Sequence, residues 1–201
     1  LPGGHCLEHD LVTGSLRVWK YWDFVLEPHE EVPADAEEKW CEELRTLLAR
    51  AVKRRLISDV PIGAFLSGGI DSSAVAAFAA RELGPGRLNT YSIGFEEPSF
   101  DESAYARRAA DLVQSTHRLK MLSIDTARQV LPSVLGRLDE PLGDSSLLPT
   151  YLLCGFAREH VTVAIGGDGG DELFAGYDPF RALRWADLYQ KAIPRPIHRA
   201  I

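Results

Sequence analysis

Short apolar runs alternate with segments of helical periodicity along most of this chain, and this alternation limits the fold more than any other feature. A run of about four to eight apolar residues between turn residues is typical of a strand, whereas apolar residues every three or four positions indicate a helix. Alternating strands and helices build a parallel sheet, so we expect an α/β fold with helices on both faces of the sheet. The expected strands are 61–66, 89–95, 117–122 and 161–165, and the expected helices are 36–57, 72–83, 103–112, 126–138 and 150–158.

Two of these segments carry more specific expectations about burial. In 161–165, Val161, Val163 and Ile165 with Ala164 between them predict a strand that is covered on both faces. In 36–57, apolar residues at three- and four-residue intervals predict a helix with one buried stripe. The stripe consists of Trp40, Leu44, Leu47, Leu48, Ala51 and Leu56.

The first 35 residues follow a different pattern from the rest of the chain. A Pro-Gly-Gly turn near the start precedes short alternating segments around 11–22, which indicate weak strands, and 26–35 contains two prolines and several acids, as a linker would. We therefore expect one segment at 1–35 and a larger domain at 36–201.

Charge and cysteine usage exclude several classes of protein. The formal net charge is -7, without a long run of Lys or Arg, which disfavours a nucleic-acid partner because such surfaces concentrate basic charge. No apolar run approaches the roughly 20 residues that span a bilayer, so no membrane partner is expected. The cysteines Cys6, Cys41 and Cys154 lack the spacing of a zinc site or a disulfide framework, which favours a cytoplasmic location.

The segment 67–73, Ser-Gly-Gly-Ile-Asp-Ser-Ser, lies where an expected strand ends and an expected helix begins. Glycines let a backbone approach an anion closely, and hydroxyls and the first helical amides can bind phosphate oxygens. Asp71 fits beside phosphates only with Mg²⁺ between them. A glycine turn with a helix cap is the alternative, and the ordinary P-loop pattern is absent.

A second loop, 166–172, reads Gly-Gly-Asp-Gly-Gly-Asp-Glu and follows the expected strand 161–165. Both loops thus come after strands of one parallel sheet, at the edge where ligands bind. Acids in a glycine turn must be solvated, cap a helix or bind a cation, and two such loops side by side could share one magnesium ion.

Together these motifs resemble a known family. Segment 67–73 resembles the pyrophosphate loop of the N-type ATP pyrophosphatases, and 167–177, Gly-Asp-Gly-Gly-Asp-Glu-Leu-Phe-Ala-Gly-Tyr, resembles the second signature of asparagine synthetase and its relatives. Segments 90–95, 100–103 and 139–141 also resemble family segments, so the likeness covers roughly 36–190. It implies an adenine nucleotide alpha hydrolase-like fold. Near the start, Leu-Pro-Gly-Gly-His and Tyr21-Trp22 resemble the tail of the family's glutaminase domain.

The resemblance implies a role for individual residues. Asp71 and Asp171 would bind magnesium, and Asp168 takes the place where many members have a glutamate that assists formation and breakdown of the aspartyl-adenylate. Asp144, Ser145 and Ser146 are weaker candidates for the amino-acid pocket. The nucleotide would be held by Leu66, Ser67, Gly68, Gly69, Ser72, Ser73, Ile93, Gly166 and Gly167.

The implied reaction is ATP-dependent conversion of aspartate to asparagine through an acyl-adenylate, with ATP and Mg²⁺ as cofactors. The chain is expected to be a fragment, truncated at its C-terminal end, of an enzyme whose glutaminase domain supplies ammonia from glutamine; a homodimer stays open. Other carboxylates remain alternatives, as in β-lactam synthetases, lasso-peptide cyclases or enzymes amidating surface sugars. A nucleotide-binding module without turnover is a further alternative, whereas a tRNA-thiolating relative should bring paired cysteines and a basic surface.

Overall fold

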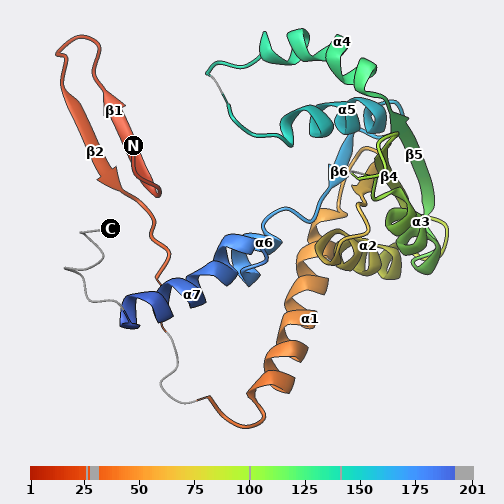
Figure 1. Ribbon diagram of the computed structural model, residues 1–201, viewed down its shortest axis with the longest axis horizontal. Coiled ribbons are helices and arrows are strands. Elements are labelled where there is room, and N and C mark those ends of the chain that lie inside the picture. Colours follow the sequence, from red (N-terminus) through yellow and green to blue (C-terminus); the bar gives the residue numbers. More distant parts are fainter. Residues whose placement is uncertain (26, 28–31, 100, 141, 193–201) are drawn as a thin grey trace. The chain divides into compact units, whose positions relative to one another are not determined.

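The computed structural model describes residues 1–25, 27, 32–99, 101–140 and 142–192. The chain divides into two compact units, Leu1–Glu42 and Glu43–Ile201 (Figure 1). The boundary expected after residue 35 stays a prediction, and the expected linker 26–35 lies partly outside the described residues.

The smaller unit contains an antiparallel hairpin of β1 (His5–His9) and β2 (Leu16–Lys20), in which His5 pairs with Lys20 and His9 with Leu16. The Asp10 carboxylate accepts hydrogen bonds from the amides of Val12 and Thr13 and so fixes the turn. Weak strands were expected around 11–22; β2 lies there, whereas β1 begins earlier. An isolated two-stranded hairpin is only marginally stable in water.

The larger unit is built on a parallel sheet, as the alternating pattern predicts. Its strands β3 (Ile62–Phe65), β4 (Asn89–Phe95), β5 (Thr116–Leu122) and β6 (Val163–Ile165) lie in the order β5-β4-β3-β6. The chain first moves outward from β3 to β5 and then returns to the other side of β3. The order of the strands therefore reverses between β3 and β6, which is where ligands bind in open parallel sheets.

Helices cover both faces of this sheet (Figure 1). On one face, α2 (Ile70–Leu83) and α3 (Ser103–Leu112) pack with the last turns of α1 (Ala36–Arg55). On the other face, α5 (Leu147–Arg158) packs against β4, and α4 (Ile124–Leu135) packs on α5. The first core consists of Val52, Ala64, Leu66, Ala76, Ala79, Leu88 and Ala110, and the second of Tyr91, Ala157 and Val161 with Phe65, Leu153 and Phe156 around them.

Two helices follow β6 in the chain. The short helix α6 (Gly170–Phe174) comes directly after the second glycine-rich loop, and α7 (Asp178–Ala192) continues from it. In the part of the chain that the structure describes, no helix is both long and apolar enough to cross a membrane.

The burial of two predicted elements differs from expectation. Only the second half of the α1 stripe reaches a core, through Leu48 and Leu56, whereas Trp40, Leu44 and Leu47 are exposed. The strand expected at 161–165 begins at Val163, whose side chain is 39% exposed because β6 is an edge of the described sheet. Periodicity reveals which residues share a face but not whether another element covers that face.

Gly63 lies in β3 under the ring of Tyr91, which is fully buried. A Cβ at position 63 would lie 2.6 Å from Cε2 of Tyr91. Glycine is therefore needed here because the tyrosine ring occupies the space of a side chain.

We expect Gly63→Ala to lower the free energy of unfolding by about 1–3 kcal/mol, because the buried ring must move within a packed core. Gly155→Ala is a matched control, since its Cβ would enter open space within α5. The control should be neutral or stabilising by about 0.5–1 kcal/mol, from helix propensity. Urea unfolding of both variants tests this, and equal midpoints would contradict it.

A buried polar group joins β4 and β5 on the α3 side of the sheet. Oγ1 of Thr90 lies 2.8 Å from Oγ of Ser115 and 3.0 Å from Nδ1 of His117. Nε2 of His117 is buried without a hydrogen-bond partner among the described residues. Burial, and secondly the charge of Arg107, lower the pKa of His117, while Asp111 opposes this shift.

This lowered pKa predicts a pH dependence of stability. Below about pH 6.5 the unfolded chain binds a proton at His117 that the folded chain resists, so stability should fall as the pH drops through this value. We expect His117→Gln to flatten the change in urea midpoint between pH 7.5 and pH 5.5. If the urea midpoint of the variant changes with pH as much as that of the unmodified protein, groups other than His117 cause the pH dependence.

Candidate active site

Two glycine-rich loops meet at the carboxyl ends of neighbouring strands. The first loop leads from β3 into α2, and the second leads from β6 into α6. Because β3 and β6 pair in parallel, with Ala64 opposite Ile165, both loops leave the sheet at the same edge. The sequence-based expectation that the two loops lie side by side is thus confirmed by the topology.

Hydroxyl groups tie the first loop together. Oγ of Ser67 lies 2.9 Å from Oγ of Ser72 and accepts a hydrogen bond from the amide of Gly69 at 3.2 Å. Oγ of Ser72 in turn accepts from the amide of Ser67 and donates to the carbonyl of Gly69. The loop therefore holds its shape by itself and presents two hydroxyls at the start of α2.

The N-terminus of α2 is open to an anion. Its N-cap, Gly69, has no side chain to accept from the first amides, and no side-chain cap is present. Uncapped amides and the positive end of the helix dipole favour phosphate groups.

Gly68 is required for a reason that the sequence did not indicate. Its φ is +85°, and a Cβ there would lie 2.4 Å from the carbonyl carbon of Tyr105 on α3. The close packing of the loop against α3 thus demands glycine, whether or not an anion approaches.

The two loops come closest at Asp71. A Cβ on Gly167 would lie 2.6 Å from the amide nitrogen of Ser72, and a Cβ on Gly170 would lie 2.4 Å from Cγ of Asp71. Glycine at both positions is what lets the second loop lie against the Asp71 carboxylate.

A cavity of about 470 Å³ opens between the loops. Most of the residues expected in the nucleotide or metal site line it, whereas Gly68, Gly69 and Ser73 do not. Ser73 instead donates its amide to the carbonyl of Gly69 at the first turn of α2. The expected residues in the lining are Leu66, Ser67, Asp71, Ser72, Ile93, Gly166, Gly167, Asp168 and Asp171.

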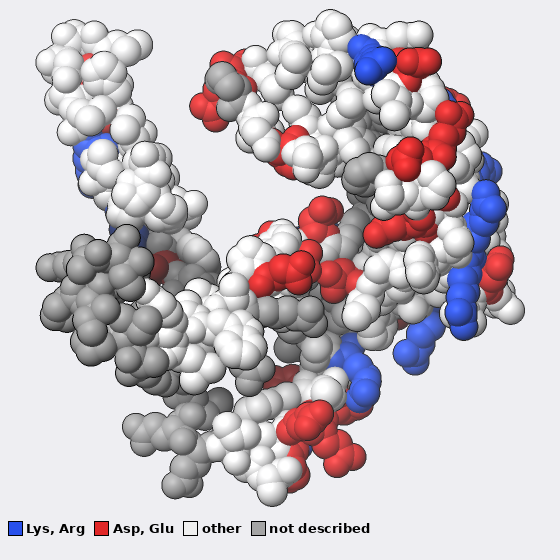
Figure 2. Space-filling view, viewed as in Figure 1, with Lys and Arg blue, Asp and Glu red and all other residues white. Residues whose placement is uncertain are grey.

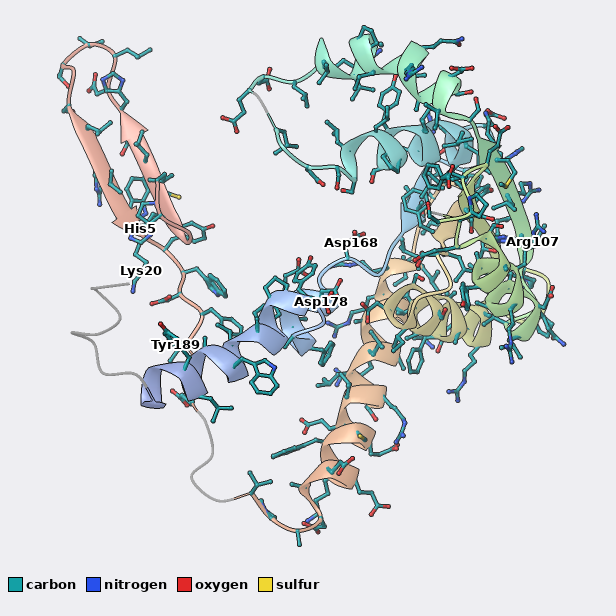
Figure 3. All side chains as sticks on the ribbon, in the orientation of Figure 1. His5, Lys20, Arg107, Asp168, Asp178 and Tyr189 are labelled. Atoms are coloured by element: carbon teal, nitrogen blue, oxygen red, sulfur yellow. The ribbon has the colours of Figure 1, made fainter. Side chains whose placement is uncertain are left out.

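The roles of these residues stay predictions. Asp168 is exposed and projects from the loop between β6 and α6 (Figure 3). The weaker candidates Asp144, Ser145 and Ser146 are not part of the cavity lining. Instead, the Asp144 carboxylate accepts from the amide and hydroxyl of Ser146, which lowers its pKa.

Several lining residues were not singled out from the sequence. Glu172 and Tyr177 lie within the second signature, and Glu102 lies within a segment that resembles the family. The sequence motifs could therefore have indicated that these residues lie near a site. The helix α5 contributes Pro149, Thr150 and Leu153 to the lining, and no sequence motif indicated these residues. They reach the cavity because α5 packs over the sheet next to β4.

The cavity gathers negative charge. Its lining contains five acidic residues, which are Asp71, Glu102, Asp168, Asp171 and Glu172. In the space-filling view, acidic side chains border the hollow of the larger unit, while Lys and Arg gather on its outer side (Figure 2). Like charges in one hollow repel one another, so the arrangement favours a bound cation.

Asp71 and Asp171 suit magnesium by chemistry and position. Among the described residues, no three His, Cys, Asp or Glu side chains are grouped so as to hold a metal alone. Magnesium, however, is usually held by one or two carboxylates together with substrate phosphates and water. A pair of aspartates beside a glycine-rich loop with uncapped helix amides fits that pattern.

Hydrogen bonds set the protonation of two groups at the cavity. The hydroxyl of Tyr177 donates to Oε1 of Glu172 at 2.6 Å. This bond is the main reason that the pKa of Tyr177 rises to about 12 and that the pKa of Glu172 is lowered. At neutral pH the phenol is therefore a donor and the carboxylate is charged.

Asp101, beside Glu102, has a structural role. Its carboxylate accepts from the hydroxyl and amide of Ser103, which lowers its pKa, and from the amide of Phe95. It thereby ties the end of β4 to the start of α3, next to the cavity.

Comparison with known proteins places these features in a family context. The sequence pattern of the family described as asparagine synthase matches residues 43–200. An asparagine synthetase [glutamine-hydrolyzing] 1 of Bacillus subtilis is 39% identical over 145 residues, covering 72% of this chain and 23% of the relative. The amidase chyE of Penicillium rubens is 34% identical over 176 residues, covering 81% of this chain and 26% of the relative.

A solved structure is also similar. The NH3-dependent NAD synthetase of Campylobacter jejuni has a TM-score of 0.43 at 21% identity, with 70% of this chain and 60% of that chain covered. The chain spans about a quarter of the length of the curated relatives it matches. Because the family pattern matches residues 43–200, the chain belongs to the asparagine synthase family.

Proposed function

We propose that this chain forms the ATP-binding, carboxylate-activating part of an asparagine synthetase. The observation that carries the proposal is the meeting of the two glycine-rich loops at one cavity, with Asp71 and Asp171 both in its lining. The proposed substrates are ATP, aspartate and ammonia, and the products are asparagine, AMP and pyrophosphate. A glutaminase domain of the same protein would release the ammonia from glutamine.

The first loop would hold the pyrophosphate part of ATP. Uncapped amides at the start of α2 provide donors for phosphate oxygens, and the hydroxyls of Ser67 and Ser72 would exchange their hydrogen bonds within the loop for bonds to the phosphates. Leu66 and Ile93 give the cavity an apolar wall for the adenosine, and Gly166 and Gly167 let the second loop pass close to it.

Asp71 and Asp171 would hold magnesium together with the phosphates. When bound there, the ion neutralises charge on the departing pyrophosphate. The second loop lies against the Asp71 carboxylate at Gly170, and the two aspartates would orient the phosphates through the ion that they hold.

The proposed chemistry has two displacements. A carboxylate oxygen of aspartate attacks the α-phosphorus of ATP, and the bond to pyrophosphate breaks, which yields β-aspartyl-adenylate. The nitrogen of ammonia then bonds to the acyl carbon, the carbon–oxygen bond to AMP breaks, and the nitrogen gives up a proton. The protein contributes orientation and charge stabilisation, with Asp168 as the candidate for assisting both steps.

The same chemistry on another carboxylate is the second candidate. One relative, at 34% identity over 176 residues, has the name amidase rather than asparagine synthetase. Both loops would bind ATP and magnesium and not the carboxylate substrate. They therefore do not determine which carboxylate reacts.

We expect Asp71→Asn to reduce aspartate-dependent pyrophosphate release from Mg-ATP by about a hundredfold or more, because the proposed magnesium site loses one of its two charged ligands. The assay uses the protein at its full natural length with ammonia supplied. Asp125→Asn on the exposed start of α4 serves as the control and should keep its activity.

The other results of this assay separate the alternatives. Release with another carboxylate but not with aspartate would assign the protein to a related amidation. Tight ATP binding without release for any carboxylate would favour a nucleotide-binding module. Full activity of the Asp71 variant would contradict the site assignment.

The close contact at Gly170 gives an independent test. A methyl group at this position must displace the Asp71 carboxylate, which can rotate away without disturbing the core. We expect Gly170→Ala to lower kcat/KM for ATP roughly tenfold to a hundredfold, since small misplacements at a reacting centre are costly. Its urea midpoint should stay near that of Gly155→Ala. A variant with unchanged kinetics would argue against a role for Asp71.

A further inference from the structure

The end of the second signature folds back on its own start. The amide of Gly176 donates to the carbonyl of Asp171 at 3.0 Å, and the hydroxyl of Tyr177 donates to Glu172 at 2.6 Å. Residues 171–177 therefore form a closed turn, with α6 inside it.

This turn is packed tightly against the side chain of Asp171. A Cβ on Gly176 would lie 1.9 Å from Oδ1 of Asp171, so a side chain at this position would have to displace that carboxylate. Ala175 adopts a left-handed conformation, with φ of 55°, to bring the chain back. A backbone held in this way restricts where the Asp171 carboxylate can point.

Tyr177 connects this turn to the next helix. Its ring stacks on Phe180 at a centroid distance of 6.1 Å and an interplanar angle of 26°. Tyr177, Glu172 and Asp171 all line the cavity. A helix as short as α6 is not stable by itself. The stacking of Tyr177 on Phe180 of α7 therefore helps to keep α6 folded beside the cavity.

A tyrosine suits this position electrostatically. The carboxylates of Asp168, Asp171 and Glu172 lie close enough to act together on the Tyr177 hydroxyl. A lysine here would compete with a bound cation for these carboxylates. A neutral donor can hold one carboxylate and leave the others free.

We propose that Tyr177 is a positioning residue, which acts through Glu172 and the closed turn to fix Asp171 for the divalent cation that accompanies the nucleotide. The inference rests on the proposed function, because it takes Asp171 as a ligand of that cation. The proposal gives a role to Glu172, Gly176 and Tyr177. Binding of ATP by the two loops would not by itself explain these residues.

The test measures Mn²⁺ binding by electron paramagnetic resonance, on the full-length protein with a non-hydrolysable ATP analogue. Tyr177→Phe should weaken Mn²⁺ binding about tenfold, which is typical when a group orienting a metal ligand is lost. Saturating Mg²⁺ should restore most of kcat. Tyr105→Phe, on the exposed side of α3, should bind Mn²⁺ like the unmodified protein.

A double-mutant cycle with Glu172→Ala separates this role from a general loss of stability. If Tyr177 acts through Glu172, Tyr177→Phe should cause little further loss of Mn²⁺ affinity in the Glu172→Ala background. An equal loss in both backgrounds, or unchanged Mn²⁺ binding by Tyr177→Phe, would overturn the inference alone. Failure of the unmodified protein to bind the analogue with Mn²⁺ would overturn the proposed function as well.

Discussion

The contact between the two glycine-rich loops at Asp71 is the constraint on which the rest of the site depends. It requires β3 and β6 to be neighbours in a parallel sheet, because the loops that follow two adjacent parallel strands start side by side at one edge. It also requires glycine at positions 167 and 170, where any side chain would meet the backbone of Ser72 or the Asp71 carboxylate. The fold and the glycines thus serve one geometric purpose, which is to bring two loops within contact distance.

That geometry carries an electrostatic cost. Five carboxylates line one cavity, and their mutual repulsion opposes the compact arrangement that holds them. Stability alone would not select such a cluster, because replacing an acid by a neutral residue would relieve the repulsion. Residues that violate the rules for a stable fold are expected where function requires them. The cluster therefore supports a cation-dependent reaction more strongly than any single aspartate does.

The sequence predicted what local patterns can encode. The strand at 89–95 and the helix at 103–112 have the expected bounds, because a short apolar run between turns and helical periodicity are properties of neighbouring residues. Exposure of Leu44 and Leu47 on α1 was not predictable, since it depends on which elements pack there. The contributions of Pro149 and Thr150 to the cavity also depend on tertiary packing, because α5 reaches the cavity by packing over the sheet next to β4.

The signature residues divide into two physical classes. Asp71 and Asp171 provide charge, whereas Gly68, Gly167 and Gly176 are needed because a side chain would collide with α3, with the first loop or with Asp171. In the proposed reaction both classes would act on ATP and magnesium, and neither would contact the group that distinguishes one carboxylate substrate from another. Members of one family can therefore share both loops and still act on different carboxylate substrates. The wall that α5 contributes to the same cavity is the place to look for that difference, because its residues lie outside both signatures.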